Sequence, residues 1–107
     1  MIFKDLTETE RLIIFQCMQL ILESDLLENA EFQTRLGIDR QELRQVIVTW
    51  PQLDDVNATS NANIAMNNCL NEVCYGIDVD DDTLQYRYGI HRQTAKQVYD
   101  KLRLAQN

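Results

Sequence analysis

The chain has 107 residues, of which 45% are hydrophobic and 25% charged, and its net charge is −7. This length is enough for one domain with a hydrophobic core, and the composition excludes a disordered chain. An acidic protein repels polyphosphate at long range, so the charge disfavours nucleic-acid binding unless basic residues gather locally. One proline and three glycines are too few turn-forming residues for a fold of many short strands, which favours an all-α fold.

The N-terminal residues and the pattern of cysteines both indicate a reducing compartment. The opening Met-Ile-Phe is followed at once by Lys4 and Asp5, so we expect no signal sequence, and no apolar run is long enough to cross a membrane. The three cysteines, Cys17, Cys69 and Cys74, form no Cys-x-x-Cys pair. We therefore expect buried, reduced thiols in a cytoplasmic protein without a membrane partner, rather than disulfides or a zinc site.

The first expected element is a helix at about 8–24. Thr7 and Glu10 have the spacing of a capping box at its start. Between Leu12 and Leu22, nine of eleven residues are apolar, so this helix is hydrophobic nearly all round. Such a helix must be buried between other helices or shared with a second molecule, so we expect either a central helix or a homodimer through helix 8–24.

Two shorter helices are expected next, at about 30–36 and 40–50. Asn29 is placed to cap the first, and Gly37 to end it in the left-handed conformation. Asp39 is expected to cap the second. The apolar stripe of this second helix is Leu43, Val46, Ile47 and Trp50, and its outward-facing residues are Arg40, Gln41, Arg44 and Gln45.

A polar loop is expected at 52–62, and a long helix at about 61–75 follows it. Thr59 or Ser60 is placed to cap this helix. Its apolar residues lie on one side, and Glu72 is expected on the polar side with the neighbouring asparagines.

The acidic run at 78–82 imitates the first ligand positions of an EF-hand calcium loop. Thr83 stands where that loop requires glycine, and Gly89 stands where it requires a bidentate glutamate. We therefore expect no metal here. Instead, Asp81 or Asp82 is expected to cap the next short helix.

The chain repeats itself at a spacing of 52 residues. The window 33–46 matches 85–98 at 8 of 14 positions. Self-similarity at a fixed spacing indicates repeated structural units. We therefore expect a single domain, 1–107, built from two tandem three-helix units at about 7–51 and 59–103.

Each unit closes with a short helix, a glycine, a branched apolar residue and a second helix, which is the helix-turn-helix plan. The second copy, Tyr88-Gly-Ile-His-Arg-Gln-Thr-Ala95, resembles the winged helix-turn-helix motif of GntR-type regulators. The resemblance implies a small cytosolic regulator whose last helix enters the major groove of duplex DNA. The expected DNA-binding residues are Arg87, His91, Arg92, Gln93, Lys96, Gln97, Lys101 and Arg103, and the helix pair would be held by Leu84, Tyr88, Ile90, Ala95, Val98 and Leu102.

A second hypothesis is an acidic protein-binding module that keeps the helix-turn-helix shape without binding DNA. Residues 1–58 hold 5 basic and 11 acidic side chains, which suits a basic protein partner. The two hypotheses differ in whether the basic residues of the second copy form one exposed patch, free of the aspartates at 78–82. The sequence has no glycine-rich loop, metal-ligand spacing or nucleophile motif, so we expect neither an enzyme nor a cofactor.

Overall fold

The computed structural model describes residues 6–24, 26–50 and 60–106, and these residues form helices and no strand. In chain order the elements are α1 (Glu8–Glu23), α2 (Asn29–Leu36), α3 (Arg40–Thr49), α4 (Asn61–Asn71), the π-helical turn η2 (Glu72–Gly76), α5 (Asp81–Tyr88) and α6 (Arg92–Gln106). The all-α class predicted from the sequence is confirmed. None of the helices described is long and apolar enough to cross a membrane.

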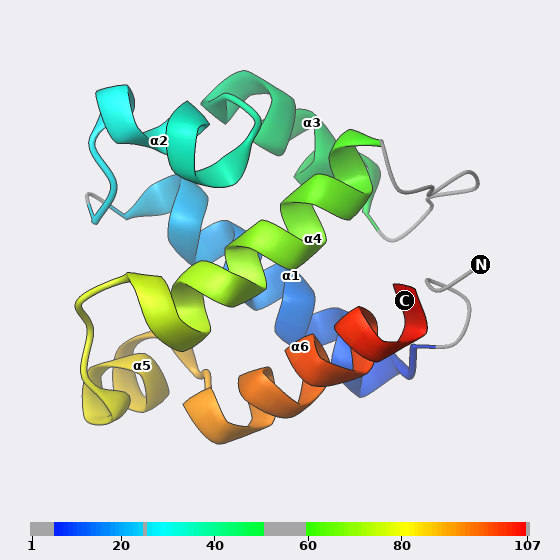
Figure 1. Ribbon diagram of the computed structural model, residues 1–107. Helices are drawn as coiled ribbons and strands as arrows, with labels where there is room; N and C mark the ends of the chain where they lie inside the picture. The colour runs from blue at the N-terminus through cyan, green and yellow to red at the C-terminus, as the bar shows by residue number, and fades with distance from the viewer. Residues whose placement is uncertain (1–5, 25, 51–59, 107) are drawn as a thin grey trace.

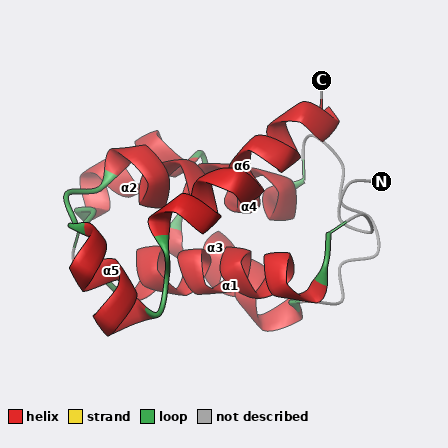
Figure 2. Ribbon diagram, turned by 90° about the horizontal axis from the view of Figure 1, so that it is seen from below, coloured by secondary structure: helices red, strands yellow, loops and turns green. Residues whose placement is uncertain are grey.

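The two long helices α1 and α4 cross at the centre of the molecule, with α2 and α3 on one side and α5 and α6 on the other (Figure 1). In a view turned by 90°, α2 and α5 lie toward the same end of the molecule (Figure 2), although they are on opposite sides of the crossed pair α1 and α4 (Figure 1). The first turns of α1 and the last turns of α6 lie toward the opposite end. This arrangement places the two glycine turns on the flanks of the central helix pair.

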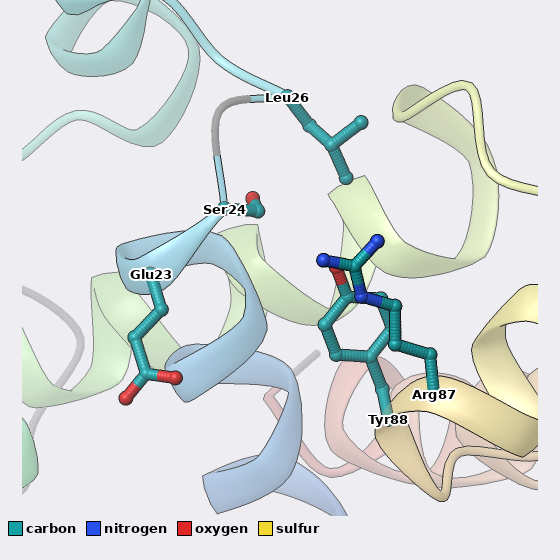
Figure 3. Close-up of a pocket in the computed structure, with 5 residues that line it drawn as sticks. All are labelled: Glu23, Ser24, Leu26, Arg87 and Tyr88. Carbon is teal, nitrogen blue, oxygen red and sulfur yellow. The ribbon is translucent and has the colours of Figure 1, made fainter.

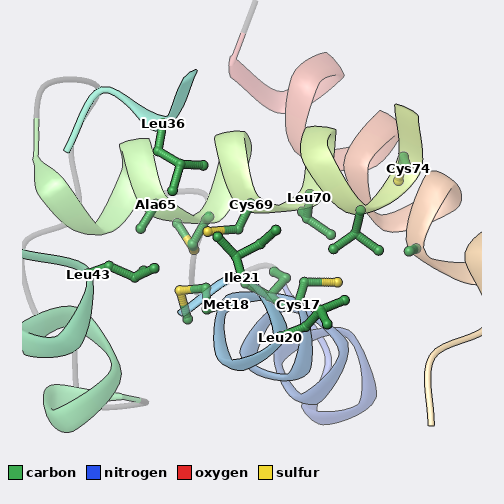
Figure 4. Packing of buried hydrophobic residues seen from close by; sticks show 14 of the residues in the cluster. Cys17, Met18, Leu20, Ile21, Leu36, Leu43, Ala65, Cys69, Leu70 and Cys74 are labelled. Atoms are coloured by element: carbon green, nitrogen blue, oxygen red, sulfur yellow. The ribbon is translucent and has the colours of Figure 1, made fainter. Parts of the chain in front are cut away.

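One hydrophobic core takes side chains from both halves of the chain. Cys17 and Met18 of α1 meet Ala65, Cys69 and Leu70 of α4 in its interior (Figure 4), and all five are fully buried. Because α1 packs against α3, α4 and α6, it is covered on several sides. The nearly all-round apolar character of α1 is thus explained by its central position.

Three capping predictions are confirmed. Thr7 and Glu10 form the capping box of α1. Asp39 begins α3 with a second capping box. The hydroxyl of Ser60 accepts the N–H of Asn63 at the start of α4, whereas Thr59 lies outside the described residues, as does most of the loop predicted at 52–62.

Two capping predictions are wrong. Asn29 is the first residue of α2 rather than its cap, because its side-chain oxygen accepts a hydrogen bond from Arg40 at 2.8 Å. Helix α5 begins at Asp81, so Asp81 and Asp82 lie in its first turn rather than at its cap, and Asp80 caps it by accepting the N–H of Thr83 at 2.7 Å. Hydrogen bonds from the backbone and side chain of Thr83 hold the pKa of Asp80 below its usual value.

The prediction that Glu72 lies on a polar face is also wrong, since Glu72 is only 5% exposed. Its carboxylate is held by the guanidinium of Arg35, with Nε to Oε1 at 2.9 Å and a second bond from Nη2. Arg35 also donates to the carbonyl of Gly76 at 3.0 Å. A Cβ at Gly76 would lie 2.0 Å from Oε2 of Glu72, so a larger residue here would displace the Glu72 carboxylate. Arg35 lies on α2. The helical periodicity around Glu72 does not reveal that a residue of another helix pairs with it.

The helix starts follow the spacing of the sequence repeat. Helices α2 and α5 begin at residues 29 and 81, and α3 and α6 begin at residues 40 and 92. Gly37 and Gly89 occupy the matching turns with φ of 77° and 71°. That the two halves superpose as equal three-helix units stays a prediction.

Candidate nucleic-acid interface

The turn between α5 and α6 is closed by Gly89 in the left-handed conformation, with φ of 71°. The N–H of Gly89 donates to the carbonyl of Gln85 at 3.1 Å, and the N–H of Ile90 donates to that of Leu84 at 3.0 Å. This pattern ends a helix and reverses the chain within a few residues. Ile90 is buried beneath the turn, so the angle between α5 and α6 is fixed by packing.

Helix α6 buries Ala95, Val98 and Leu102 against the core. The side chains on the opposite face are therefore directed to solvent. Of the predicted DNA-binding residues, His91, Gln93, Gln97 and Arg103 are exposed and Lys96 is half-buried.

Arg92, the first residue of α6, is turned inward. Its guanidinium donates to the carbonyl of Val73 at 3.2 Å, to the carbonyl of Val79 and to the carboxylate of Asp81. Only 17% of its side chain is exposed. Arg92 thus joins the end of the α4–η2 helix to the loop before α5 and the first turn of α5.

Arg40 occupies the same place in the first copy and was also expected to face outward, which is incorrect. Its guanidinium donates to the carbonyls of Leu22 and Leu27 and to the side chain of Asn29, at 2.8–2.9 Å. It also lies 4.3 Å from the centre of the Phe32 ring. Both arginines are therefore clamps between a long helix and the short helix that follows it.

Lys101 is engaged with the other end of the chain. Its ammonium group lies 2.7 Å from Oε1 of Glu10 on α1. Burial acts to raise the pKa of Glu10, but the hydrogen bonds from Lys101 and Thr7 outweigh it and hold that pKa below its ordinary value. The pair joins the first turn of α1 to α6.

Lys96 and Arg103 lie against tyrosine rings. The ammonium of Lys96 is 5.2 Å from the ring centre of Tyr75, and the guanidinium of Arg103 is 5.5 Å from that of Tyr99. The two rings are themselves 6.3 Å apart. The sequence repeat gave no sign of this tyrosine pair, because neither Tyr75 nor Tyr99 has an aromatic residue at the matching position of the first copy.

Arg87 lies in the last turn of α5 and is exposed. It borders a pocket with Glu23, Ser24, Leu26 and Tyr88 (Figure 3). The predicted DNA-binding residues are therefore divided between the face of α6, the ion pairs of Arg92 with Asp81 and Lys101 with Glu10, and this pocket.

All three cysteines are free and buried, as expected. Burial raises the pKa of the Cys17 and Cys69 thiols well above the usual value and that of Cys74 to about 11. All three are thus held as neutral thiols at physiological pH. Within the described ranges, no three His, Cys, Asp or Glu side chains gather as metal ligands would.

No protein-family model, curated protein or solved structure matches this chain.

Proposed function

We propose that the protein is an acidic interaction module that binds a basic surface on a partner protein. The observation that carries this proposal is what the five basic side chains in residues 59–107 contact. Arg92 and Lys101 are held by Asp81 and Glu10, and Arg87 borders the pocket. A duplex needs several free cations on one surface to displace its counterions, and this helix pair offers few.

The face of α6 retains only Lys96 and Arg103, and neither forms an ion pair among the described residues. Asp100 lies between them, four residues after Lys96 and three before Arg103, so it shares their side of the helix. Its exposed carboxylate offsets half of the local positive charge. The aspartates at 78–82 are also part of this half, through the pair of Asp81 with Arg92.

Exposed acidic side chains occur on α2 and around the start of α5, which lie toward the same end of the molecule (Figure 2). Glu28 and Glu31 border or begin α2, and Asp78 and Asp82 lie in the loop before α5 or in its first turn; all four are exposed. The nearby cation Arg35 is shared between Glu72, inside the molecule, and Glu31, at 3.7 Å. Such a surface attracts a basic partner and speeds its association, with a strong dependence on salt.

The proposal is tested by measuring binding of a fluorescent lysine-rich peptide and of a random DNA duplex over the same salt range. We expect the peptide to bind at low salt and the DNA not to. Changing Asp78 and Asp82 to asparagine should weaken peptide binding more than the same charge change at Glu8 and Asp100. Equal effects of the two double variants would show that only net charge matters, and DNA binding in preference to the peptide would reject the proposal.

Duplex DNA is the second candidate partner, favoured by the closed glycine turn before α6 and by the exposed amides of Gln93 and Gln97. Amide side chains can read adenine edges in the major groove. If this function holds, alanine at Gln93 and Lys96 weakens DNA binding more than alanine at the matching pair, Gln41 and Arg44. Arg92 is unsuitable for this test, because its removal disturbs the fold.

A further inference from the structure

The pocket between the end of α1 and the end of α5 has a volume of about 390 Å³. Its lining residues are Glu23, Ser24, Leu26, Arg87 and Tyr88. The guanidinium of Arg87 lies 5.5 Å from the ring centre of Tyr88. Figure 3 shows this guanidinium on the side of Ser24 and Leu26, with the carboxylate of Glu23 turned away from it.

The first copy shows what an arginine at this position binds. Arg35 precedes Gly37 by two residues, just as Arg87 precedes Gly89. Arg35 holds the carboxylate of Glu72 through two nitrogen atoms and donates to the carbonyl of Gly76. Two parallel bonds from a guanidinium to a carboxylate are a strong and directional interaction.

The second copy has the arginine but lacks the acid. At the spacing of 52 residues, the position of Glu72 is taken by Leu20 and that of Gly76 by Ser24. Arg87 forms no ion pair with any described residue. The hydroxyl of Ser24 is buried and has no hydrogen-bond partner among the described residues, which is an unfavourable state for a polar group unless something binds it.

The turns confirm that these two places correspond. Gly37 faces Asn68 of α4, and Gly89 faces Gln16 of α1, with Cβ positions 3.6 and 3.8 Å from the respective amide nitrogens. Asn68 and Gln16 are themselves 52 residues apart. The end of each short helix therefore meets the long helix of the other half in the same way.

We propose that this pocket binds the carboxylate group of a small organic acid, in the place that the Glu72 carboxylate holds in the first copy. Arg87 binds the carboxylate through two N–H groups. Leu26 and the ring of Tyr88 contact a short apolar body. Binding at this site requires neither a protein nor a DNA partner, so it stands apart from the proposed function.

The test is an NMR titration of the intact protein with benzoate, with sodium chloride at equal ionic strength as the control. We expect saturable shifts of the Arg87 Nε–H and of the amides around Ser24 and Tyr88. Arg87→Gln should weaken binding by about tenfold or more, since it removes a bidentate charged pair. Arg103→Gln is the matched control and should bind normally, because Arg103 lies over Tyr99 at the same 5.5 Å but is not among the residues that line this pocket.

A second variant rebuilds the arrangement of the first copy. Leu20→Glu combined with Ser24→Gly places a carboxylate and a glycine where Glu72 and Gly76 stand. The new carboxylate should pair with Arg87 and abolish benzoate binding in a folded protein, as judged by circular dichroism. If this double variant folds and still binds benzoate at the same residues, the proposed site is wrong.

Three results would overturn the proposal. One is the absence of saturable shifts in the unmodified protein. Another is equal binding of benzoate and inorganic phosphate, which would mean that the site selects negative charge rather than a carboxylate. The third is binding that occurs only in Asp25→Asn: Asp25 lies outside the described residues but is next to Ser24 in the chain, and that result would assign the site to the chain's own carboxylate.

Discussion

At the scale of single residues, the same arginine position serves the same purpose in both halves. Arg40 and Arg92 each donate to two backbone carbonyls and to one side-chain oxygen, and these acceptors belong to matching parts of the two copies. Backbone carbonyls at helix ends require such donors. The sequence repeats an Arg-Gln pair at 40–41 and 92–93, and the arginine of each pair is therefore required by the fold.

Replacing Arg92 by glutamine should lower the free energy of unfolding by about 1–3 kcal/mol, because the carbonyls of Val73 and Val79 lose their donor. Urea unfolding followed by circular dichroism measures this. Arg103→Gln is the control and should change stability by no more than about 0.5 kcal/mol, since Arg103 is exposed. Equal stability of the two variants would show that Arg92 is not a clamp.

The pair of Arg35 and Glu72 allows a prediction about coupling. Arg35→Met leaves the buried Glu72 carboxylate unpaired and should cost about 3–5 kcal/mol. Glu72→Leu should cost less, because Arg35 is partly exposed and keeps Glu31 as a partner at 3.7 Å. The double variant should cost clearly less than the sum, because both charges are gone. A double-mutant cycle in urea measures the difference, and additive losses would mean that the two groups do not stabilise each other.

At the scale of elements, the glycine turn before α6 sets the direction of that helix. Gly89 has φ of 71°, and the nearest atom to a Cβ there, Nε2 of Gln16, is 3.8 Å away. A larger residue at this position is therefore opposed by the backbone conformation and not by a clash. At Gly37 the nearest atom, Cγ2 of Ile64, is closer, at 3.4 Å.

Gly89→Ala should destabilise the protein by about 1–2 kcal/mol, the cost of the left-handed conformation for a residue with a Cβ. Gly89→Asn should cost less, because asparagine tolerates that conformation better. Thermal unfolding of the two variants, with the exposed Gln85→Ala as control, measures the order. A loss that is greater for asparagine than for alanine would indicate a steric cause instead.

The exposed faces of α3 and α6 were predicted only in part. Gln41, Arg44 and Gln45 are exposed on α3, as are Gln93 and Gln97 on α6, in agreement with their helical spacing. Periodicity assigns a residue to a side of its helix but does not say what another helix brings there. Arg40 and Arg92 lie at the edges of these faces. There, the contacts that another helix offers decide whether a side chain turns inward or toward solvent.

At the scale of the whole molecule, one ion pair joins the first turn of α1 to α6. Lys101 contacts Glu10 at 2.7 Å, 91 residues apart in the chain. The pKa of Glu10 is lower in the folded protein than its ordinary value of 4.5. Its contribution to stability is therefore complete above that value and is lost as the pH falls through the lower folded pKa.

Lys101→Met should lower stability at pH 7 by about 0.2–1 kcal/mol, the range for an ion pair near the surface. The difference from the unmodified protein should shrink as the pH falls below 4.5, where Glu10 becomes protonated. Urea unfolding at a series of pH values measures it. Lys96→Met serves as control, because Lys96 has no carboxylate partner among the described residues, and its effect should not follow this pH dependence.

Self-association through α1 stays a prediction, and the structure identifies the residue that tests it. Met18 is fully buried, whereas Leu12 is 54% exposed. If α1 mediates a homodimer, Leu12→Lys should shift the protein to monomer in sedimentation velocity while leaving its helical content unchanged. Val48→Lys on α3 is the matched control. An unmodified protein that sediments as a monomer at high concentration would contradict the homodimer.

The sequence by itself determined the features that depend on neighbours along the chain. The capping boxes at Thr7 and Asp39 bond residues three apart, and the turns at Gly37 and Gly89 require only a local backbone conformation. The helix-turn-helix resemblance implied that Ile90 and Val98 hold the helix pair, and both are buried. These features follow from local geometry, which a sequence states directly.

Only the tertiary structure decided which charged residues are free. Arg92, Glu72 and Lys101 sit at positions that helical spacing leaves polar. Asp81 is 11 residues from Arg92 in the chain, Arg35 is 37 residues from Glu72, and Glu10 is 91 residues from Lys101. A long charged side chain can reach either solvent or a neighbouring helix from the same backbone position. Which of the two it reaches is set by the packing of the helices, and with it the surface that remains for a partner.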